Sequence, residues 1–327
     1  MKHIIVAVLA AGSLAANILS ATVPASAQNW PTKPVRIVNT FAPGGAADFL
    51  ARTVADELSN AFGEQFYVET HSGAAGAIGV NMVVNTPPDG YNFVITNITM
   101  LVLSPIGNPR LGYDPFRDLT NIAYLGGSPI VLSVNAKSGV NTLADFIALG
   151  KKSPKPLTYS SSGVGSSGQL FGELLGQKLG IRVEHVPYKG AAQGLMDLVG
   201  GHIAFSAQTV TSTAAQMRGG ALNGIAITAK ERMPDFPKIP TFKELGYPEF
   251  VNPVWFSLSG PANLPKDITQ KINREVAKAM AKPAMQDTMR KQGMITEAMT
   301  PGELHGLIER ETAFWKPVMA KAGLIQK

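Results

Sequence analysis

The sequence predicts two α/β domains between which the chain crosses twice. Short β-like runs alternate with helix-like runs in two successive series, which is typical of sheets with parallel crossovers. The segments after Ser259 read as helices without new strands, so they should cover a sheet that already exists. With 327 residues, 45% of them hydrophobic, the chain is also long enough for two domains with sizeable cores.

The first series begins after Lys33 and alternates three strands with two helices. The motif PPDG at Pro87–Gly90 predicts the turn before the third strand. The predicted elements are strand Val35–Val38, helix Ala46–Leu58, strand Phe66–Glu69, helix Ala77–Val84 and strand Asn92–Thr96.

The second series begins near Ile130 and repeats the alternation, so it predicts a second α/β unit. Its expected elements are strand Ile130–Val134, helix Leu143–Leu149, strand Leu157–Ser160, helix Gln169–Leu179, strand Arg182–Val186, helix Ala191–Val199, the run Ile203–Ser206 and strand Leu222–Ile227.

The end of the chain is predicted to be helical after the strand-like run Val254–Ser259. Pro265, Pro283 and Pro301 stand near the starts of the helix-like segments, where a missing N–H costs nothing. These segments are Lys266–Ala281, Ala284–Lys291 and Pro301–Ala322.

The domain boundaries follow from these elements. We expect the chain to cross to the second domain near residues 126–129 and to return near residues 250–255. Residues 28–128 and 251–327 then form domain 1, and residues 129–250 form domain 2. Two crossings make a hinge, and a hinge between two lobes makes a cleft that can close on a ligand.

The first residues have the pattern of an export signal. A basic start at Met1-Lys2-His3 precedes a mostly apolar run from Ile4 to Ala21, and Ala25-Ser26-Ala27 supplies an A-x-A cleavage signal. We expect residues 1–27 to be a signal peptide, cleaved after Ala27, and the protein to act outside the cytoplasmic membrane. An uncleaved membrane anchor is the alternative, since the apolar run approaches the ~18 residues that span a bilayer.

Composition excludes several kinds of chemistry. The chain has no cysteine, which excludes disulfides, thiolate catalysis and Cys-ligated zinc. Its formal charge of +6 modestly favours anionic ligands. The basic cluster of Lys151, Lys152 and Lys155 has no interleaved aromatic residues, so we expect a solvated loop there and no nucleic-acid binding.

Catalysis finds little support in the sequence. Ser166 and Ser167 have no base beside them, although a distant one could serve. The histidines after the signal segment show no metal-binding spacing and adjoin no nucleophile motif; they are His71, His185, His202 and His305. We therefore expect no catalytic residue, no metal site and no cofactor. A serine hydrolase that uses Ser166 or Ser167 is the alternative.

A glycine-rich loop raises the question of a dinucleotide. The stretch SSSGVGSSGQ at 160–169 contains G-x-G-x-x-G at Gly163, Gly165 and Gly168. A dinucleotide fingerprint follows a strongly apolar strand, whereas the strand predicted here is short and rich in hydroxyls. Convergent N–H groups, serine hydroxyls and the positive end of the next helix suit a smaller anion such as a carboxylate. A flexible, solvent-exposed loop is the other interpretation.

A second loop of the same construction favours the anion interpretation. The stretch FAPGGAAD at 41–48 follows the first predicted strand and opens the first predicted helix. In open α/β sheets, ligands bind at the carboxyl ends of strands, where such loops lie. One loop from each lobe would hold one ligand from both sides. We expect Asp48 to oppose the helix dipole rather than to contact the ligand.

With these motifs the chain resembles the substrate-binding proteins of tripartite tricarboxylate transporters, also called the Bug family. The resemblance extends over essentially the whole chain after Ala27. It is carried by WPTKPVRIV at 30–38, FAPGGAAD at 41–48, VETHSGAAGAIG at 68–79, PPDGYNF at 87–93, LTYSSSGVGSSGQL at 157–170, HVPYKGAAQGLMDLVGGHIAFS at 185–206 and IPTFKELGYPEF at 239–250.

The resemblance implies a two-lobed periplasmic binding protein of the Venus flytrap type, which closes on a small carboxylate and delivers it to a two-component membrane permease. We expect a monomer, because docking to a partner benefits from two free lobes. The ligand-binding residues that we expect are Phe41, Ala42, Pro43, Gly44, Gly45, Ala46, Ala47, Thr96, Asn97, Thr99, Ser162, Gly163, Gly165, Ser166, Ser167, Gln169 and Gln208.

One departure from the family pattern bears on the ligand. Many relatives read G-G-x-V-D-x-x-F-D/N, whereas this chain reads GGHIAFSAQ at 200–208, so Ala204 and Gln208 stand where relatives often carry acids. Because neutral Gln208 could not pair with a ligand ammonium, we expect a dicarboxylate or an aromatic carboxylate without an amino group. A sensory protein that presents the same ligand to a signalling receptor is an alternative.

Overall fold

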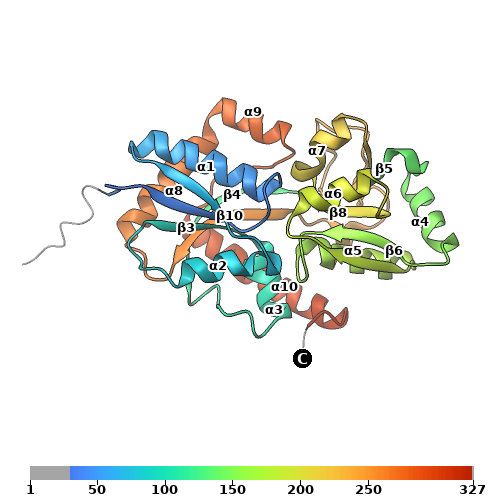
Figure 1. Cartoon of the computed structure of the whole chain (residues 1–327), viewed down its shortest axis with the longest axis horizontal. Helices are drawn as coiled ribbons and strands as arrows, with labels where there is room; N and C mark the ends of the chain where they lie inside the picture. Colours follow the sequence, from blue (N-terminus) through green and yellow to red (C-terminus); the bar gives the residue numbers. More distant parts are fainter. Residues whose placement is uncertain (1–29, 326–327) are drawn as a thin grey trace, which may run out of the picture.

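The computed structural model describes residues 30–325, so the predicted signal peptide and its cleavage site lie outside the described part of the chain. Within these residues the chain forms two lobes, each built on a five-stranded sheet (Figure 1). The strand orders are β2-β1-β3-β10-β4 and β7-β6-β8-β5-β9. The predicted two-lobed α/β fold is confirmed.

The first lobe has a mixed sheet, in which antiparallel strands accompany the parallel crossovers that the alternation predicted. Strand β1 is parallel to β2 and β3, whereas β10 is antiparallel to β3 and β4. The elements are β1 (Val35–Asn39), α1 (Ala46–Phe62), β2 (Phe66–Thr70), η1 (Ala74–Gly76), α2 (Ala77–Val84), β3 (Asn92–Asn97), η2 (Thr99–Leu103), α3 (Ser104–Gly107), β4 (Leu119–Ser128), β10 (Val254–Pro261), α8 (Lys266–Ala281), α9 (Pro283–Lys291) and α10 (Pro301–Lys321).

The second lobe is also mixed. Strand β6 is parallel to β7 and β8, and β5 is antiparallel to β8 and β9. The elements are β5 (Ile130–Asn135), η3 (Ala136–Ser138), α4 (Leu143–Lys152), β6 (Leu157–Ser161), α5 (Ser167–Leu179), β7 (Val183–Pro187), α6 (Ala191–Val199), β8 (Phe205–Thr209), α7 (Val210–Arg218) and β9 (Leu222–Ile227), and η4 (Pro248–Phe250) follows before the chain returns to the first sheet.

The sequence prediction missed β4 and α7. Strand β4 contains Asn121, Gly126 and Gly127, which have low β propensity, and it forms because it is paired with β10 along its length. Helix α7 reads VTSTAAQMR, whose first turn is rich in hydroxyl residues that are mediocre helix formers. The Thr209 side chain caps this helix by accepting a hydrogen bond from Ser212 N.

The two lobes are joined where β4 passes into β5 and where the chain returns through β10. Val254 of β10 pairs with Ser128 of β4, so the two connections lie side by side. Thr228 forms a hydrogen bond with each connection: its Oγ1 accepts from Ile130 N at 2.9 Å and donates to Asn252 O at 3.1 Å. Bending at this narrow junction would separate the lobes without disturbing either sheet.

Each lobe has buried apolar side chains at the sheet–helix contacts. In the second lobe, Tyr159 and Phe205 are fully buried and stack with ring centroids 4.9 Å apart, and Phe146 meets Phe205 edge-on. In the first lobe, α8 and α10 pack on β4, so the prediction that the helical tail covers an existing sheet is confirmed.

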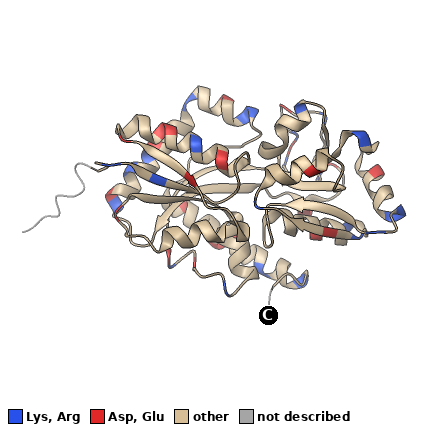
Figure 2. Cartoon of the chain, viewed as in Figure 1, with Lys and Arg blue, Asp and Glu red and all other residues tan. Residues whose placement is uncertain are grey.

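Charged side chains lie mainly on helices and outer turns, and β8 and β10 in the interior carry none (Figure 2).

Across residues 30–325 no helix combines the length and the hydrophobicity that a bilayer crossing needs.

Candidate ligand-binding cleft

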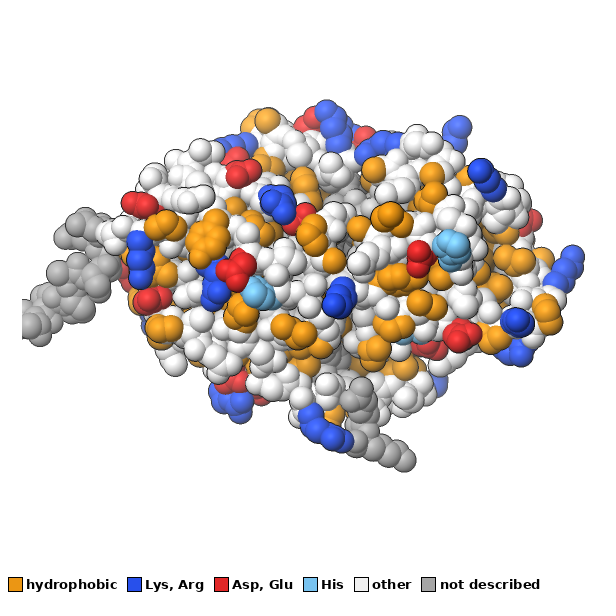
Figure 3. Space-filling model, viewed as in Figure 1, with side chains coloured by type: hydrophobic (Ala, Val, Ile, Leu, Met, Phe, Trp, Pro, Cys, Tyr) orange, Lys and Arg blue, Asp and Glu red, His pale blue; other side chains and the backbone are white. Residues whose placement is uncertain are grey.

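The lobes are closed on each other, and on the face shown in Figure 3 they meet without an open channel. Hydrogen bonds cross the boundary from Ala42 N to Lys189 O (3.1 Å), from Ala46 N to Ser212 Oγ (3.2 Å) and from Ser167 N to Thr99 Oγ1 (3.1 Å). Between these contacts lies a cavity of about 40 Å³, which has room for a few water molecules.

Both lobes contribute to the wall of this cavity, which we call the cleft. The first lobe supplies Phe41, Gly45, Ala46, Ala47, Asn97, Thr99, Val254 and Phe256, and the second supplies Ile130, Ser162, Ser166, Ser167, Gly168, Ala191, Ala207, Gln208, Thr209 and Ser212. None of these described lining residues is ionisable, so any attraction for an anion has to come from dipoles and hydrogen-bond donors.

Helices from both lobes begin at the cleft. Ala46, Ser167 and Ala191 are the first residues of α1, α5 and α6, and Thr209 caps α7. The first N–H groups of a helix have no partner within it and carry the positive end of its dipole. Because these helix starts converge, the cleft is a positive site without a formal charge, which suits a carboxylate.

The loop before α1 is held by polar side chains beneath it. Gly44 N donates to Asp48 Oδ2 at 3.1 Å, and Phe41 N donates to Asn39 Oδ1 at 3.3 Å. Asp48 is buried, also accepts from Arg52, and belongs to the first turn of α1. Asp48 thus lies in the helix turn where an acid can oppose the dipole, and it also fixes the loop.

The loop before α5 is organised around the Ser161 hydroxyl. Ser166 caps the helix by accepting from Gln169 N, and its own hydroxyl donates to Ser161 Oγ at 3.1 Å. Ser161 Oγ also lies 2.5 Å from His185 Nε2. Burial lowers the pKa of His185 to about 4, so this imidazole is neutral at physiological pH.

Gln208 lines the cleft and carries an amide donor without a partner in the described part of the chain. Its side chain is almost fully buried, and Oε1 accepts a hydrogen bond from Ser162 Oγ at 2.9 Å. Nε2 has no partner among residues 30–325. Because Ser162 fixes Oε1, the amide is oriented with its NH₂ group available, and a buried amide without an acceptor is costly. A ligand oxygen would satisfy it.

The structure brings most of the expected site residues to the cleft. Those that line it are Phe41, Gly45, Ala46, Ala47, Asn97, Thr99, Ser162, Ser166, Ser167 and Gln208. The others among the expected residues do not line it: Ala42, Pro43, Gly44, Thr96, Gly163, Gly165 and Gln169.

The expected residues outside the cleft have other contacts. The Thr96 hydroxyl lies inside the first sheet, 2.8 Å from the hydroxyls of Ser257 and Ser259. Gly165 and Gln169 bond to each other and line a wider opening of about 770 Å³ between the lobes. A Cβ added to Gly163 would lie 3.2 Å from the backbone nitrogen of Ala75 in the other lobe.

Sequence reasoning missed Thr209 and Ser212, which line the cleft at the start of α7. Their signal is the hydroxyl spacing T-x-x-S after a strand, which predicts an N-cap once α7 is recognised. It also missed the lining residue Gly168. A Cβ at Gly168 would overlap the carbonyl oxygen of Ala207, so this third glycine of the G-x-G-x-x-G lets α5 pack closely on β8.

Metal binding would require a cluster of histidines or acids, and hydrolysis would require a base beside Ser166 or Ser167. Among residues 30–325 no group of three or more histidines or acids is placed to hold a metal ion. His185 is bonded to Ser161 rather than to Ser166 or Ser167. A neutral histidine held by a buried hydroxyl of the loop is a structural partner.

Two lobes that close over an uncharged cleft lined by helix starts define a periplasmic binding protein. The model of the tripartite tricarboxylate transporter family receptor (TctC) matches residues 50–324. The chain belongs to this family, whose members are transport receptors rather than enzymes.

Relatives and solved structures agree with this assignment. The chain is 30% identical to protein BugT of Bordetella pertussis over 301 residues, 92% of each chain. An R. palustris protein solved with adipate is 31% identical, with a TM-score of 0.87 over 90% of this chain and 98% of that one. MatC from Rhodopseudomonas palustris, solved with malate, is 26% identical, with a TM-score of 0.83 over 88% of this chain and 99% of that one.

Proposed function

We propose that this receptor captures a small carboxylate without an ammonium group in the cleft and delivers it to a membrane permease. The unpartnered Nε2 of Gln208, facing a cleft at which helices α1, α5, α6 and α7 begin, carries the proposal. The site has donors to offer and no described carboxylate, so it suits ligand oxygens better than a ligand ammonium.

Relatives support the same class of ligand. The two Rhodopseudomonas proteins were solved with adipate and malate, which are dicarboxylates without an amino group. We assign one carboxylate to the loops 41–47 and 162–169, and a second acceptor group of the ligand to Gln208. An aromatic carboxylate without an amino group satisfies the same donors.

The contacts between the lobes suggest how binding proceeds. Ala46 N and Ser167 N, the first N–H groups of α1 and α5, now donate to hydroxyls of the opposite lobe. A carboxylate between the loops would accept from these N–H groups and leave the hydroxyls of Ser212 and Thr99 free to donate to it. Since the closed cleft holds only a few waters, the ligand enters while the lobes are apart and is then enclosed.

A thermal-shift screen tests the proposal. The purified protein is unfolded and refolded to remove bound solutes, then screened against aliphatic mono-, di- and tricarboxylates, aromatic carboxylates, amino acids and NAD. A ligand at about 100 times its Kd adds ~2.7 kcal/mol, which raises the melting temperature by several degrees. Stabilisation by a few carboxylates alone is expected; stabilisation by glutamate or aspartate above every dicarboxylate, or by NAD alone, contradicts the proposal.

The delivery step and the location have their own tests. We propose export with cleavage after Ala27, action in the periplasm and a monomeric receptor. N-terminal sequencing of the exported protein should begin at Gln28, and sedimentation should give a single chain. Uptake of the ligand by vesicles that contain the permease should require the receptor, whereas binding to a sensor domain instead would identify a signalling role.

A further inference from the structure

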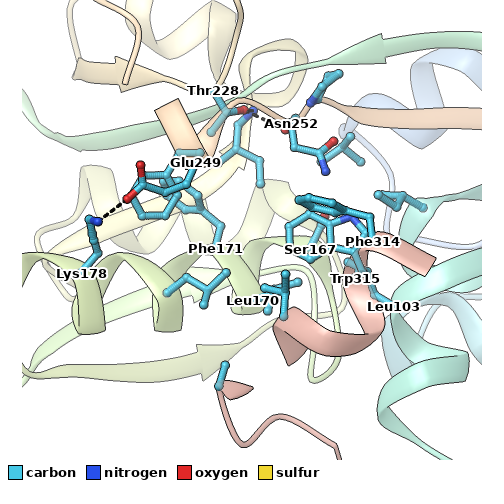
Figure 4. A pocket seen from close by; sticks show the side chains of 18 of the residues that line it. Leu103, Ser167, Leu170, Phe171, Lys178, Thr228, Glu249, Asn252, Phe314 and Trp315 are labelled. Carbon is cyan, nitrogen blue, oxygen red and sulfur yellow. Dashed lines mark hydrogen bonds and ion pairs between the residues drawn. The ribbon is translucent and has the colours of Figure 1, made fainter. Parts of the chain in front are cut away.

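A second and larger cavity lies between the lobes, on the side of the junction where α5 faces α10 (Figure 4). Its volume is about 520 Å³, within the range of small-molecule sites. It shares only Ile130, Ser167 and Val254 with the cleft. The proposed carboxylate function assigns it no role.

One face of a helix from each lobe forms its walls. Leu170, Phe171 and Leu174 lie three and four positions apart on α5, and so form one apolar face. On α10, Phe314 and Val318 have the same spacing, with Trp315 between them. The returning segment, with Phe250 and Pro253, closes the space between these helices.

Aromatic rings from both lobes line the cavity. Phe171 and Phe250 of the second lobe meet edge-on with centroids 5.4 Å apart, and Phe314 and Trp315 of α10 do so at 5.2 Å. Phe314 is 57% exposed, which is unusually high for a large aromatic residue. A further ring between these pairs would make the edge-to-face contacts that aromatic groups favour.

The main polar groups around the cavity already have partners. Lys178 and Glu249 form an ion pair at 2.5 Å, and Trp315 Nε1 donates to Glu311 Oε2 at 2.8 Å. Thr228 Oγ1 is occupied by its two backbone partners. Gln177 and Lys321, which also line the cavity, are exposed to solvent and keep their polar groups hydrated. The remaining surface is mainly aromatic and aliphatic, and this favours an uncharged apolar ligand.

We propose that this cavity is a second binding site, for an uncharged aromatic molecule of one to three rings. Its ligand would contact α5 of one lobe and α10 of the other, so occupancy favours the arrangement in which those helices face each other. The site is distinct from the cleft, because the two share only Ile130, Ser167 and Val254 and its recognition requires no carboxylate.

Binding of N-phenyl-1-naphthylamine tests the proposal. This uncharged probe fluoresces more strongly in apolar surroundings, and Trp315 in the wall can transfer energy to it. We expect saturable binding at one site per chain. Phe314→Glu on the first-lobe wall and Leu174→Gln on the second-lobe wall should each weaken binding about tenfold. Val318→Trp, which places a bulky ring inside the cavity, should weaken binding at least as much.

Met196→Glu is the matched control, because Met196 is 72% exposed on α6 and lines none of the described cavities. Circular dichroism and the melting temperature show whether each variant is folded. Equal probe binding by the unmodified chain, Phe314→Glu and Val318→Trp would overturn the proposal, as would unsaturable binding. The assay contains no carboxylate, so failure of the proposed carboxylate function leaves its result unchanged.

Discussion

The backbone N–H of Ser167 in the second lobe donates to the hydroxyl Oγ1 of Thr99 in the first, at 3.1 Å. The reverse contact exists as well, since Ala46 N in the first lobe donates to Ser212 Oγ in the second. Each lobe thus caps a helix start of the other with a hydroxyl. The same donors that hold the lobes closed are those that a carboxylate would use, so closure and ligand binding draw on one set of N–H groups.

Gly190→Ala should weaken ligand binding without weakening the fold. Gly190 has extended backbone that alanine also adopts, and the added Cβ would meet Ala42 of the opposite lobe at 2.9 Å. The clash arises only when the lobes close, so we expect affinity for the best carboxylate to fall about tenfold or more by calorimetry. Gly302→Ala, where a Cβ meets nothing, is the control. Unchanged affinity in Gly190→Ala would show that ligand binding does not need this closed arrangement.

Gln208→Glu should change the class of ligand. The new carboxylate removes the free amide donor and places a negative charge in the cleft, so affinity for dicarboxylates should fall by about one to two orders of magnitude. Aspartate or glutamate should gain affinity through their ammonium group. Calorimetry with both ligand classes measures the exchange, and Gln270→Glu on the exposed face of α8 controls for charge. Retained dicarboxylate affinity would mean that Gln208 does not contact the ligand.

Gly168→Ala should lower both stability and affinity. The added Cβ would collide with the Ala207 carbonyl within the same lobe, which forces α5 away from β8. We expect a loss of about 1–3 kcal/mol in the free energy of unfolding, measured by urea denaturation. Gly190→Ala provides the contrast, since it should reduce affinity alone. A stable Gly168→Ala variant would remove the packing explanation for the third glycine.

His185 should make the stability of the protein depend on acid. Burial lowers its pKa to about 4, whereas the unfolded chain has the ordinary value near 6.5. Between these values the unfolded chain binds a proton that the folded chain does not, so stability is lost as the pH falls from about 6.5 to about 4.

His185→Gln removes the titratable imidazole and keeps a side chain that can form a hydrogen bond with Ser161. Its urea midpoint should fall less between pH 7 and pH 4.5 than that of the unmodified protein. His305→Gln, on the exposed side of α10, should behave like the unmodified protein. Parallel pH profiles for all three proteins would rule out His185 as the source of the acid sensitivity.

The positions of most strands and helices could be predicted from the local sequence pattern. The alternation of runs located every predicted strand and helix, and Ala77–Val84, Ala191–Val199, Leu222–Ile227 and Lys266–Ala281 agree at both ends. The mixed character of the sheets could not be read in this way, because the direction of β4, β5 and β10 depends on pairing with strands far along the chain. For the same reason β4 itself, with its glycines, was missed.

The sequence by itself determined the two glycine-rich loops, the absence of cysteine and the absence of lysine and arginine from those loops, because residue type and order settle each of them. Only the tertiary structure decided which groups face the cleft. In the tertiary structure the Thr96 hydroxyl bonds within the first sheet, away from the cleft. Helix α7 brings Thr209 and Ser212 to the cleft, and Gln208 Nε2 has no partner among the described residues. These outcomes depend on contacts between residues far apart in the sequence, such as Thr96 with Ser257 and Ser162 with Gln208, which a local sequence pattern does not specify.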